Sequence, residues 1–252
     1  MIIRKSPEEI DKMRKAGRIV AATIERTVAA VRPGMTTAAL DAVSEATILE
    51  HGATPSFKGY RGFPASLCVS VNEQVVHGIP GKRVLAEGDL LSLDFGAIWE
   101  GYHADAAVSL FVGAEAPSSE AEKLVRVTEE GLQAGIGQIR AGGRLTDISH
   151  AVQQVVEGAG FSLVREYTGH GIGRSLHEDP QVFNYGAPGR GPELRPGWVL
   201  CVEPMATIGD WPTRVLADGW TVVTDDGSLA AHFEHTIAIT EAGPEVLTGR
   251  PA

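Results

Sequence analysis

Four acidic residues stand in apolar segments where a charge is costly. Asp94 ends the run Leu-Leu-Ser-Leu-Asp, and Glu203 ends the similar run Val-Leu-Cys-Val-Glu. Asp105 and Glu234 follow later, each beside further apolar residues. A carboxylate that is removed from water must find a partner or give up its charge. Four such groups, placed in two similar pairs, predict a bound cation.

The spacing of the first pair can be tested against a hairpin. The segment 90–111 is expected to form two strands joined near Glu100. A four-residue turn places Asp94 directly opposite Asp105, with Cβ atoms roughly 4.5–5.5 Å apart. A two-residue turn at Glu100-Gly101 makes the two carboxylates diagonal neighbours on the same face. In both registers the two anions repel each other unless a positive charge lies between them.

A histidine in a glycine-rich stretch completes the predicted metal site. His170 is flanked by Gly169 and Gly171, and such small neighbours let a ligand approach the backbone closely. The glycine pattern lacks the spacing of a dinucleotide site. One imidazole with several carboxylates suits Mn²⁺, Fe²⁺, Co²⁺ or Zn²⁺, and bridging carboxylates favour two ions about 3.5–4 Å apart. The candidate ligands are Asp94, Asp105, His170, Glu203 and Glu234.

An internal duplication indicates how these residues are positioned. Residues 85–94 align without gaps with 194–203, and residues 31–52 align with 139–160 at a constant offset of 108. Each half is expected to contain two amphipathic helices followed by a strand pair. No Ser/Gly-rich linker separates the halves, so 1–252 is interpreted as one catalytic domain, duplicated over about 7–110 and 118–240.

Local signals place the ends of the helices. Ser6 is the expected N-cap of the first helix, with Pro7 at its first position and Glu9 completing a capping box. That helix is expected to end near Val31. The other three are expected to start at Thr36 or Thr37, at Ser118 or Ser119 and at Thr146, and to end near Gly52, Arg140 and Gly158 or Gly160.

Composition excludes several classes of protein. The 252 residues are 43% hydrophobic and 21% charged, which is typical of a folded globular chain. A formal charge of −10 argues against nucleic acid as the main partner. No signal peptide and no apolar run of membrane-spanning length is found, so we expect a cytoplasmic location and no membrane partner. Cys68 and Cys201 are interpreted as small buried hydrophobes.

The order and spacing of the five candidate ligands resemble those of the type I methionine aminopeptidases. The resemblance extends from the first helix to Thr240 and implies the α+β pita-bread fold, in which helices cover a central antiparallel sheet around two pseudo-symmetric halves. It implies that Asp94 chelates one divalent ion and that Asp105 and Glu234 bridge two. His170 and Glu203 would then hold the second ion.

The same resemblance assigns the substrate site. His77 is implied to hydrogen-bond the substrate, and His177 to contact the scissile carbonyl. The methionine pocket is carried over as Tyr60, Phe63, Cys68, His77 and Trp220. Phe63 replaces a tyrosine, Phe57 falls where a cysteine is frequent, and Leu176 falls where a phenylalanine is common. These departures keep the pocket apolar and affect fine selectivity.

The implied reaction is removal of the initiator methionine from nascent proteins whose second residue is small. A metal-activated hydroxide would attack the scissile carbonyl. Glu203 would carry a proton to the leaving amine, and His177 would stabilise the oxyanion. The resemblance also implies a monomer that works on nascent chains, with the ribosome as a possible partner.

Two other interpretations remain open on the sequence. A prolidase or aminopeptidase P-like Xaa-Pro peptidase has a similar ligand set, but usually carries a large domain before it. A non-catalytic pita-bread module that binds peptides would be expected to have lost ligands, whereas all five positions are filled here.

Overall fold

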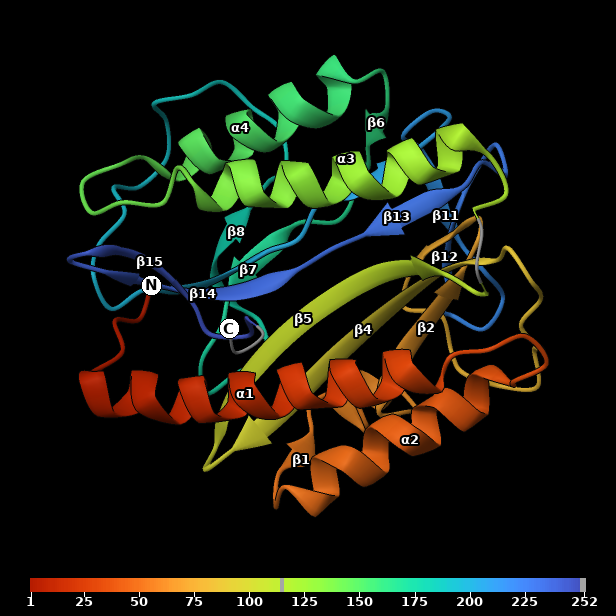
Figure 1. Cartoon of the computed structure of the whole chain (residues 1–252). Helices are drawn as coiled ribbons and strands as arrows, with labels where there is room; N and C mark the ends of the chain where they lie inside the picture. Colours follow the sequence, from red (N-terminus) through yellow and green to blue (C-terminus); the bar gives the residue numbers. More distant parts are fainter. Residues whose placement is uncertain (114–115, 250–252) are drawn as a thin grey trace.

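The first helix begins as its capping signals predict. A computed structural model describes residues 1–113 and 116–249, so five residues of the predicted domain, 114–115 and 250–252, lie outside the described part. The Ser6 hydroxyl accepts from the Glu9 backbone N–H, and the Glu9 carboxylate accepts from the Ser6 N–H. This capping box starts α1 (Pro7–Ala30). The helix crosses the front of the sheets in Figure 1.

The other helices follow the predicted order with two shifted ends. Helix α2 (Thr37–Glu50) has Thr36 as its N-cap, as expected. Helix α3 (Ser119–Ile136) ends four residues before the predicted Arg140, with Gly137 as its C-cap.

The predicted N-cap of the fourth helix is wrong. Helix α4 (Leu145–Gly158) has Arg144 at its N-cap position, and the Arg144 N–H donates to the Asp147 carboxylate. Thr146 lies inside the helix as its second residue, and its hydroxyl bonds to Arg190 instead: it accepts from the Arg190 N–H over 2.8 Å and donates to the Arg190 carbonyl over 3.1 Å.

Within the described residues, the strands form four small sheets in which every pairing is antiparallel. The first holds β1 (Thr54–Pro55), β2 (Leu67–Val71), β4 (Leu90–Trp99) and β5 (Tyr102–Phe111). The largest holds β7 (Gly169–Gly171), β8 (Glu178–Val182), β9 (Val199–Val202), β14 (His235–Thr240) and β15 (Gly243–Val246). The other two contain β3 (Gln74–Val76), β11 (Thr213–Val215) and β12 (Val222–Thr224), and β6 (Ser162–Leu163), β10 (Met205–Thr207) and β13 (Ala230–His232).

Each helix pair covers one half of the strands, and the two halves meet in the middle. Helices α1 and α2 pack on β4 and β2, while α3 and α4 pack on the β9 and β13 side (Figure 1). Backbone bonds join the halves: the Ala107 N–H donates to the Glu234 carbonyl over 3.3 Å, and the Glu234 N–H donates back over 3.0 Å. The predicted α+β class is confirmed.

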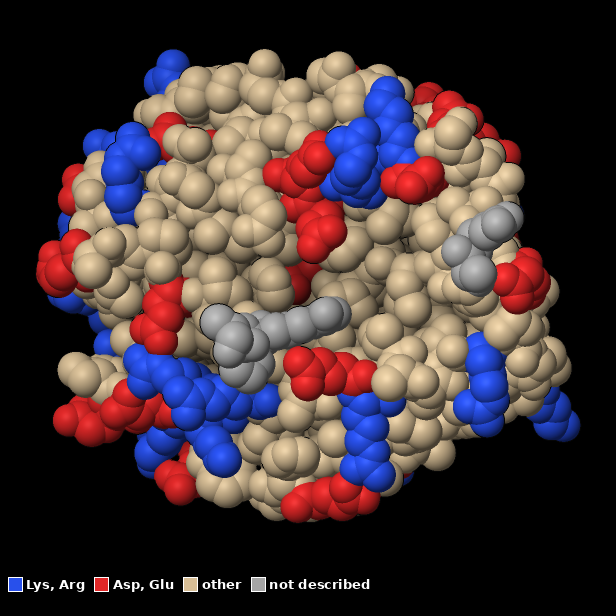
Figure 2. Space-filling model, viewed as in Figure 1, with Lys and Arg blue, Asp and Glu red and all other residues tan. Residues whose placement is uncertain are grey.

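Charges of both signs lie side by side on the helix-covered face of the molecule, as Figure 2 shows. Ion pairs within this surface include Arg26 with Glu50 and Arg126 with Glu130. Exposed pairs of this kind contribute little to stability, about 0–1 kcal/mol each. The stability of the fold must therefore come mainly from its buried apolar side chains.

The chain end crosses α1 at a point that only glycine allows. A Cβ added to Gly17 would lie 2.2 Å from the Leu247 carbonyl oxygen, closer than any real contact. Gly158 offers a matched control at the end of α4, because a Cβ there would meet nothing within 4 Å. The two glycines therefore separate close packing from helix propensity.

We expect Gly17→Ala to lower the free energy of unfolding by roughly 1–3 kcal/mol, because a packed core tolerates an added methyl poorly. Gly158→Ala should leave stability unchanged or raise it by up to about 1 kcal/mol, since alanine is the better helix former. Urea denaturation monitored by circular dichroism measures both. Equal midpoints for the two variants would contradict the proposed contact.

Candidate metal centre and substrate pocket

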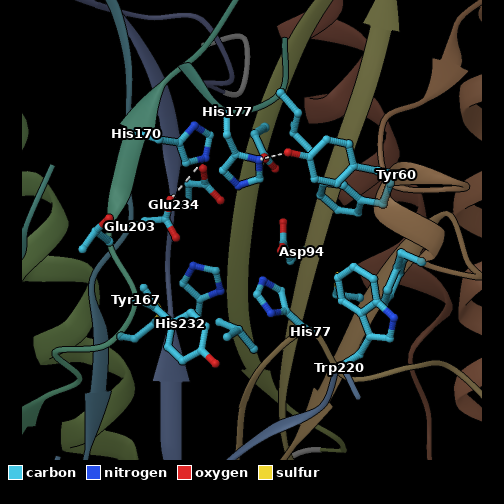
Figure 3. Close-up of a pocket in the computed structure, with 18 of the residues that line it drawn as sticks. Tyr60, His77, Asp94, Tyr167, His170, His177, Glu203, Trp220, His232 and Glu234 are labelled. Atoms are coloured by element: carbon cyan, nitrogen blue, oxygen red, sulfur yellow. Dashed lines mark hydrogen bonds and ion pairs between the residues drawn. The ribbon is translucent and has the colours of Figure 1, made fainter. Parts of the chain in front are cut away.

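One cavity of about 310 Å³ brings together every residue that the sequence predicted for the site. It lies between the two halves, and Figure 3 shows His170, Glu203 and Glu234 on one side, Tyr60 and Trp220 on the other, and His177 and Asp94 between them. The predicted residues that line it are Tyr60, Phe63, Cys68, His77, Asp94, Asp105, His170, His177, Glu203, Trp220 and Glu234. Side chains more than 150 positions apart in the chain thus face a common space.

The β4–β5 hairpin sets the positions of Asp94 and Asp105. Asp94 pairs with Ala107, and Asp105 pairs with Gly96, so the turn is the two-residue turn at Glu100-Gly101. The directly opposed register from a four-residue turn is wrong, and the diagonal register is correct. Glu100 and Gly101 both have positive φ, as a tight hairpin turn requires. Diagonal neighbours two residues apart share a face, so both carboxylates point into the cavity.

Strands of the second half carry the other three candidate ligands. His170 lies on β7 opposite Cys201 on β9, so their side chains share a face, and Glu203 lies two residues after Cys201. Glu234 immediately precedes β14. The Asn184 side-chain amide donates to the Glu203 carbonyl over 2.9 Å and fixes the backbone there.

Thr236 ties the two halves together at the site. Its hydroxyl accepts from the Asp105 N–H over 2.9 Å and donates to the Asp105 carbonyl over 2.7 Å. This side chain therefore takes the place of a strand neighbour and satisfies both backbone groups of a buried residue. Asp105 of the first half is thereby held against Glu234 of the second.

Some oxygens of the buried carboxylate cluster lack a hydrogen-bond donor. Asp94 Oδ1, Asp105 Oδ1 and Glu234 Oε1 are buried without a hydrogen-bond partner among the described residues. Burial raises the pKa of Asp94 from 3.8 to about 7. Burial, together with the neighbouring carboxylates, raises the pKa values of Asp105, Glu203 and Glu234 well above their usual range. Buried acceptors without donors are what a bound cation would satisfy.

His170 is oriented as a metal ligand. Its Nδ1 lies 2.9 Å from the Gly171 carbonyl oxygen, which can only accept, so Nδ1 carries the proton. Nε2 then presents its lone pair to the cavity, 3.4 Å from Glu203 Oε1. Burial lowers the pKa of His170 to about 3, so the ring is neutral and its contact with Glu203 is not an ion pair.

Ligand atoms of four residues converge closely enough to hold an ion. Donor atoms of Asp105, His170, Cys201 and Glu234 all lie within 4.8 Å of one another. Cys201 was interpreted as a buried hydrophobe, and it is fully buried. Burial raises its thiol pKa, so the sulfur is protonated and a weak ligand. The oxygen and nitrogen donors fit a hard or borderline divalent cation.

An apolar pocket adjoins the acidic cluster. Phe63 and Trp220 meet edge to face with ring centroids 5.1 Å apart, and His77 lies edge-on to Trp220 at 6.2 Å. Cys68 is buried in the same group of side chains. Phe57 and Leu176, the two other departures from the family pattern, also line the cavity and are buried. The pocket would therefore accept a flexible apolar side chain.

His177 stands between the pocket and the acidic cluster. Its Nδ1 lies 2.9 Å from the Tyr60 hydroxyl, and the two rings stack with centroids 5.4 Å apart. When Tyr60 donates this hydrogen bond, the His177 proton lies on Nε2. The His170 ring is 4.2 Å away. Burial, with a contribution from Arg61, lowers the pKa of His177, which favours the neutral ring.

Several residues of the cavity were missed on the sequence, among them His232 and Tyr167. His232 on β13 is buried, and its Nε2 has no hydrogen-bond partner among the described residues. It lies two residues before Glu234, so the alternation of an extended chain could have indicated it. Tyr167 meets His77 with ring centroids 5.6 Å apart. Only its place just before the glycine-rich stretch could have pointed to it.

Comparison with known proteins places the chain in a family. The model of metallopeptidase family M24 matches residues 11–241, and the chain belongs to this family. It is 55% identical to a methionine aminopeptidase of Clostridium perfringens and 54% identical to methionine aminopeptidase 1 of Bacillus subtilis. Each alignment covers 98% of this chain and 99% of the relative. The predicted resemblance to methionine aminopeptidases is confirmed.

Solved structures confirm the predicted pita-bread fold. A methionine aminopeptidase of Thermotoga maritima superposes with a TM-score of 0.97 at 49% identity, covering 99% of this chain and all of that one. A prolidase of Pyrococcus furiosus superposes with a TM-score of 0.79 at 21% identity, covering 99% of this chain and 66% of that one. The second likeness shows a shared fold only. No helix within residues 1–113 and 116–249 is long and apolar enough to cross a membrane.

The raised carboxylate pKa values predict how stability depends on pH without metal. A carboxyl group whose pKa is higher in the folded state stabilises the fold at low pH, and this contribution is lost as pH rises through the folded pKa. For Asp94 that window runs from 3.8 to about 7. The protein from which metal has been removed with a chelator should therefore unfold at a lower temperature at about pH 8 than at about pH 5.

Divalent metal should remove this loss, because it replaces the protons and binds more tightly as pH rises. Metal-free Asp94→Asn should melt above metal-free wild type at about pH 8 and close to it at about pH 5, since its amide never ionises. Calorimetry with and without Mn²⁺ measures both effects. A variant that melts at or below wild type at both pH values would contradict the proposed repulsion.

Proposed function

We propose that this chain is a dinuclear-metal methionine aminopeptidase that removes the initiator methionine from nascent proteins when the second residue is small. The observation that carries the proposal is the joining of an apolar pocket to a buried acidic cluster within one 310 Å³ cavity. Its support is the full-length similarity to relatives named methionine aminopeptidase. The Xaa-Pro peptidases share the fold at much lower identity.

The candidate ligands divide between two ions. Asp94 would chelate one ion, and Asp105 and Glu234 would lie between both. His170 and Glu203 would hold the other. A pair of divalent ions, when bound, supplies a water of lowered pKa and polarises the substrate carbonyl. Co²⁺, Mn²⁺, Fe²⁺ and Zn²⁺ all suit these donors.

The aromatic pocket would bind the methionine side chain. Met is flexible, and its sulfur makes favourable contacts with aromatic rings, such as those of Tyr60, Phe63 and Trp220. Cys68 and His77 would close the pocket, and His77 would also hydrogen-bond the substrate backbone. Burial lowers the pKa of His77 to about 4, so the ring is neutral, which suits this role.

Two side chains would act on the reacting groups. Glu203 would take a proton from the attacking water and deliver it to the leaving amine, since its carboxyl group stands at the edge of the cluster. His177 would donate from Nε2 to the developing oxyanion while its Nδ1 accepts from the Tyr60 hydroxyl.

The rest of the assignment follows from this activity. We infer one catalytic domain over 1–252, with related halves at about 7–110 and 118–240. The substrates are the N-termini of nascent peptides, so the ribosome is the expected neighbour of a monomer working in the cytoplasm. The net charge of −10 makes independent nucleic-acid binding unfavourable.

The central prediction is metal-dependent release of methionine. After chelation and addition of Mn²⁺ or Co²⁺, Met-Gly peptides should be cleaved and matched Met-Leu peptides should be cleaved far more slowly. A panel of Xaa-Pro peptides is assayed in parallel under the same conditions. Faster cleavage of the Xaa-Pro panel would identify a prolidase-like enzyme, and metal binding without cleavage of any peptide would identify a peptide-binding module.

His177→Ala should lower kcat by about 100- to 1,000-fold, the usual cost of losing one oxyanion donor. KM should change much less, because the methionine pocket is intact. Tyr60→Phe keeps the ring and removes only the hydroxyl that fixes the His177 tautomer, so its loss should be smaller. Metal content measured by atomic emission is the control. An active His177→Ala with unchanged kcat would remove this residue from the mechanism.

A further inference from the structure

A buried ion pair lies directly behind the loop that carries His177. Lys5 Nζ is 2.7 Å from Glu178 Oε2, and the two side chains are 3% and 8% exposed. Exposed ion pairs are common on this protein, but a pair removed from water needs good geometry to compensate for lost hydration. The pair connects the start of the chain to the residue that follows His177.

Both members of the pair are anchored to the backbone. The Lys5 N–H donates to the Gly197 carbonyl over 2.7 Å, just before β9. Glu178 Oε1 accepts from the Ser175 N–H over 3.2 Å, within the loop that leads to His177. Lys5 is therefore fixed to the segment before β9, and the Glu178 carboxylate holds the loop that leads to His177.

The loop has no free space on the side of the ion pair. A Cβ added to Gly173 would lie 2.5 Å from Lys5 Cε and 2.7 Å from Glu178 Oε1. On the other side, the His103 N–H donates to the Gly173 carbonyl over 2.8 Å. The loop is thus clamped between β5 and the ion pair, so a change in the pair would shift its backbone.

We propose that Lys5 is a positioning residue for His177 and acts through Glu178. The ion pair fixes the backbone of His177 from behind, while the Tyr60 hydroxyl fixes the ring from the front. The imidazole then keeps the direction needed to reach the scissile carbonyl. The inference rests on the proposed function, because it assumes that His177 acts on a bound peptide.

A double-mutant cycle separates positioning from ordinary stabilisation. Lys5→Met alone would leave a buried carboxylate unpaired, so the test uses Lys5→Met with Glu178→Gln. This combination is uncharged and keeps an acceptor for the Ser175 N–H. Replacing a buried ion pair by neutral groups is often tolerated by the fold. Should the combination not fold, Glu178→Gln alone enters the same cycle.

The combined variant should lose roughly tenfold in kcat with little change in KM, since a small displacement of a catalytic group lowers rate. In a His177→Ala background the same substitutions should change kcat less than about twofold, because the group that they position is gone. An equal loss in both backgrounds would overturn the proposal.

A second, partly exposed ion pair provides a control. Arg14 Nε lies 2.6 Å from Glu245 Oε1 and connects α1 to β15, both outside the loop that carries His177, and the two side chains are 31% and 36% exposed. Arg14→Met with Glu245→Gln should leave kcat unchanged in both backgrounds. A tenfold loss from this control would show that the cycle reports general stability.

Nuclear magnetic resonance of the His177 ring gives a readout independent of activity. The imidazole signals should move in the Lys5→Met, Glu178→Gln variant and stay in place in the control variant. If the wild type releases no methionine with metal, the proposed function fails, and these spectra still decide whether Lys5 positions the ring. Unchanged His177 signals in the combined variant would overturn the inference.

Discussion

The structure brings together buried carboxylates that repel one another, and the described side chains do not compensate this repulsion. Four carboxylates face one buried cavity, and three of their oxygens have no hydrogen-bond partner among the described residues. Burial raises the pKa of every one of them. Such a cluster is favourable only when protons or cations enter it. The remaining architecture can be understood as the framework that holds these charges together.

That framework joins the sheet of β4 and β5 to the sheet of β9 and β14. The Ala107 and Glu234 backbones exchange hydrogen bonds, and the Thr236 hydroxyl satisfies both backbone groups of Asp105. Helices α1 and α2 cover the strands of the first half, and α3 and α4 cover those of the second (Figure 1). Each half supplies part of the proposed ligand set. The site therefore exists only where the halves are joined.

Features that repeat along the chain were predictable from the sequence, and features that depend on distant contacts were not. The capping box at Ser6, the amphipathic helices and the acidic strand ends follow local rules. The hairpin register needed the turn at Glu100-Gly101, which the residues alone left undecided. Lys5 was not predicted because its role comes from Glu178, 173 positions further along the chain.

The division of the proposed ligands between two halves joined by Thr236 has a consequence for the lifetime of the protein. Ions held from both sides would favour states in which the halves stay docked, so their loss would make opening of the molecule more frequent. Proteases degrade chains through such opened states. The abundance of this protein in a cell should accordingly follow the supply of its metal, and starvation for that metal would remove the polypeptide as well as its activity.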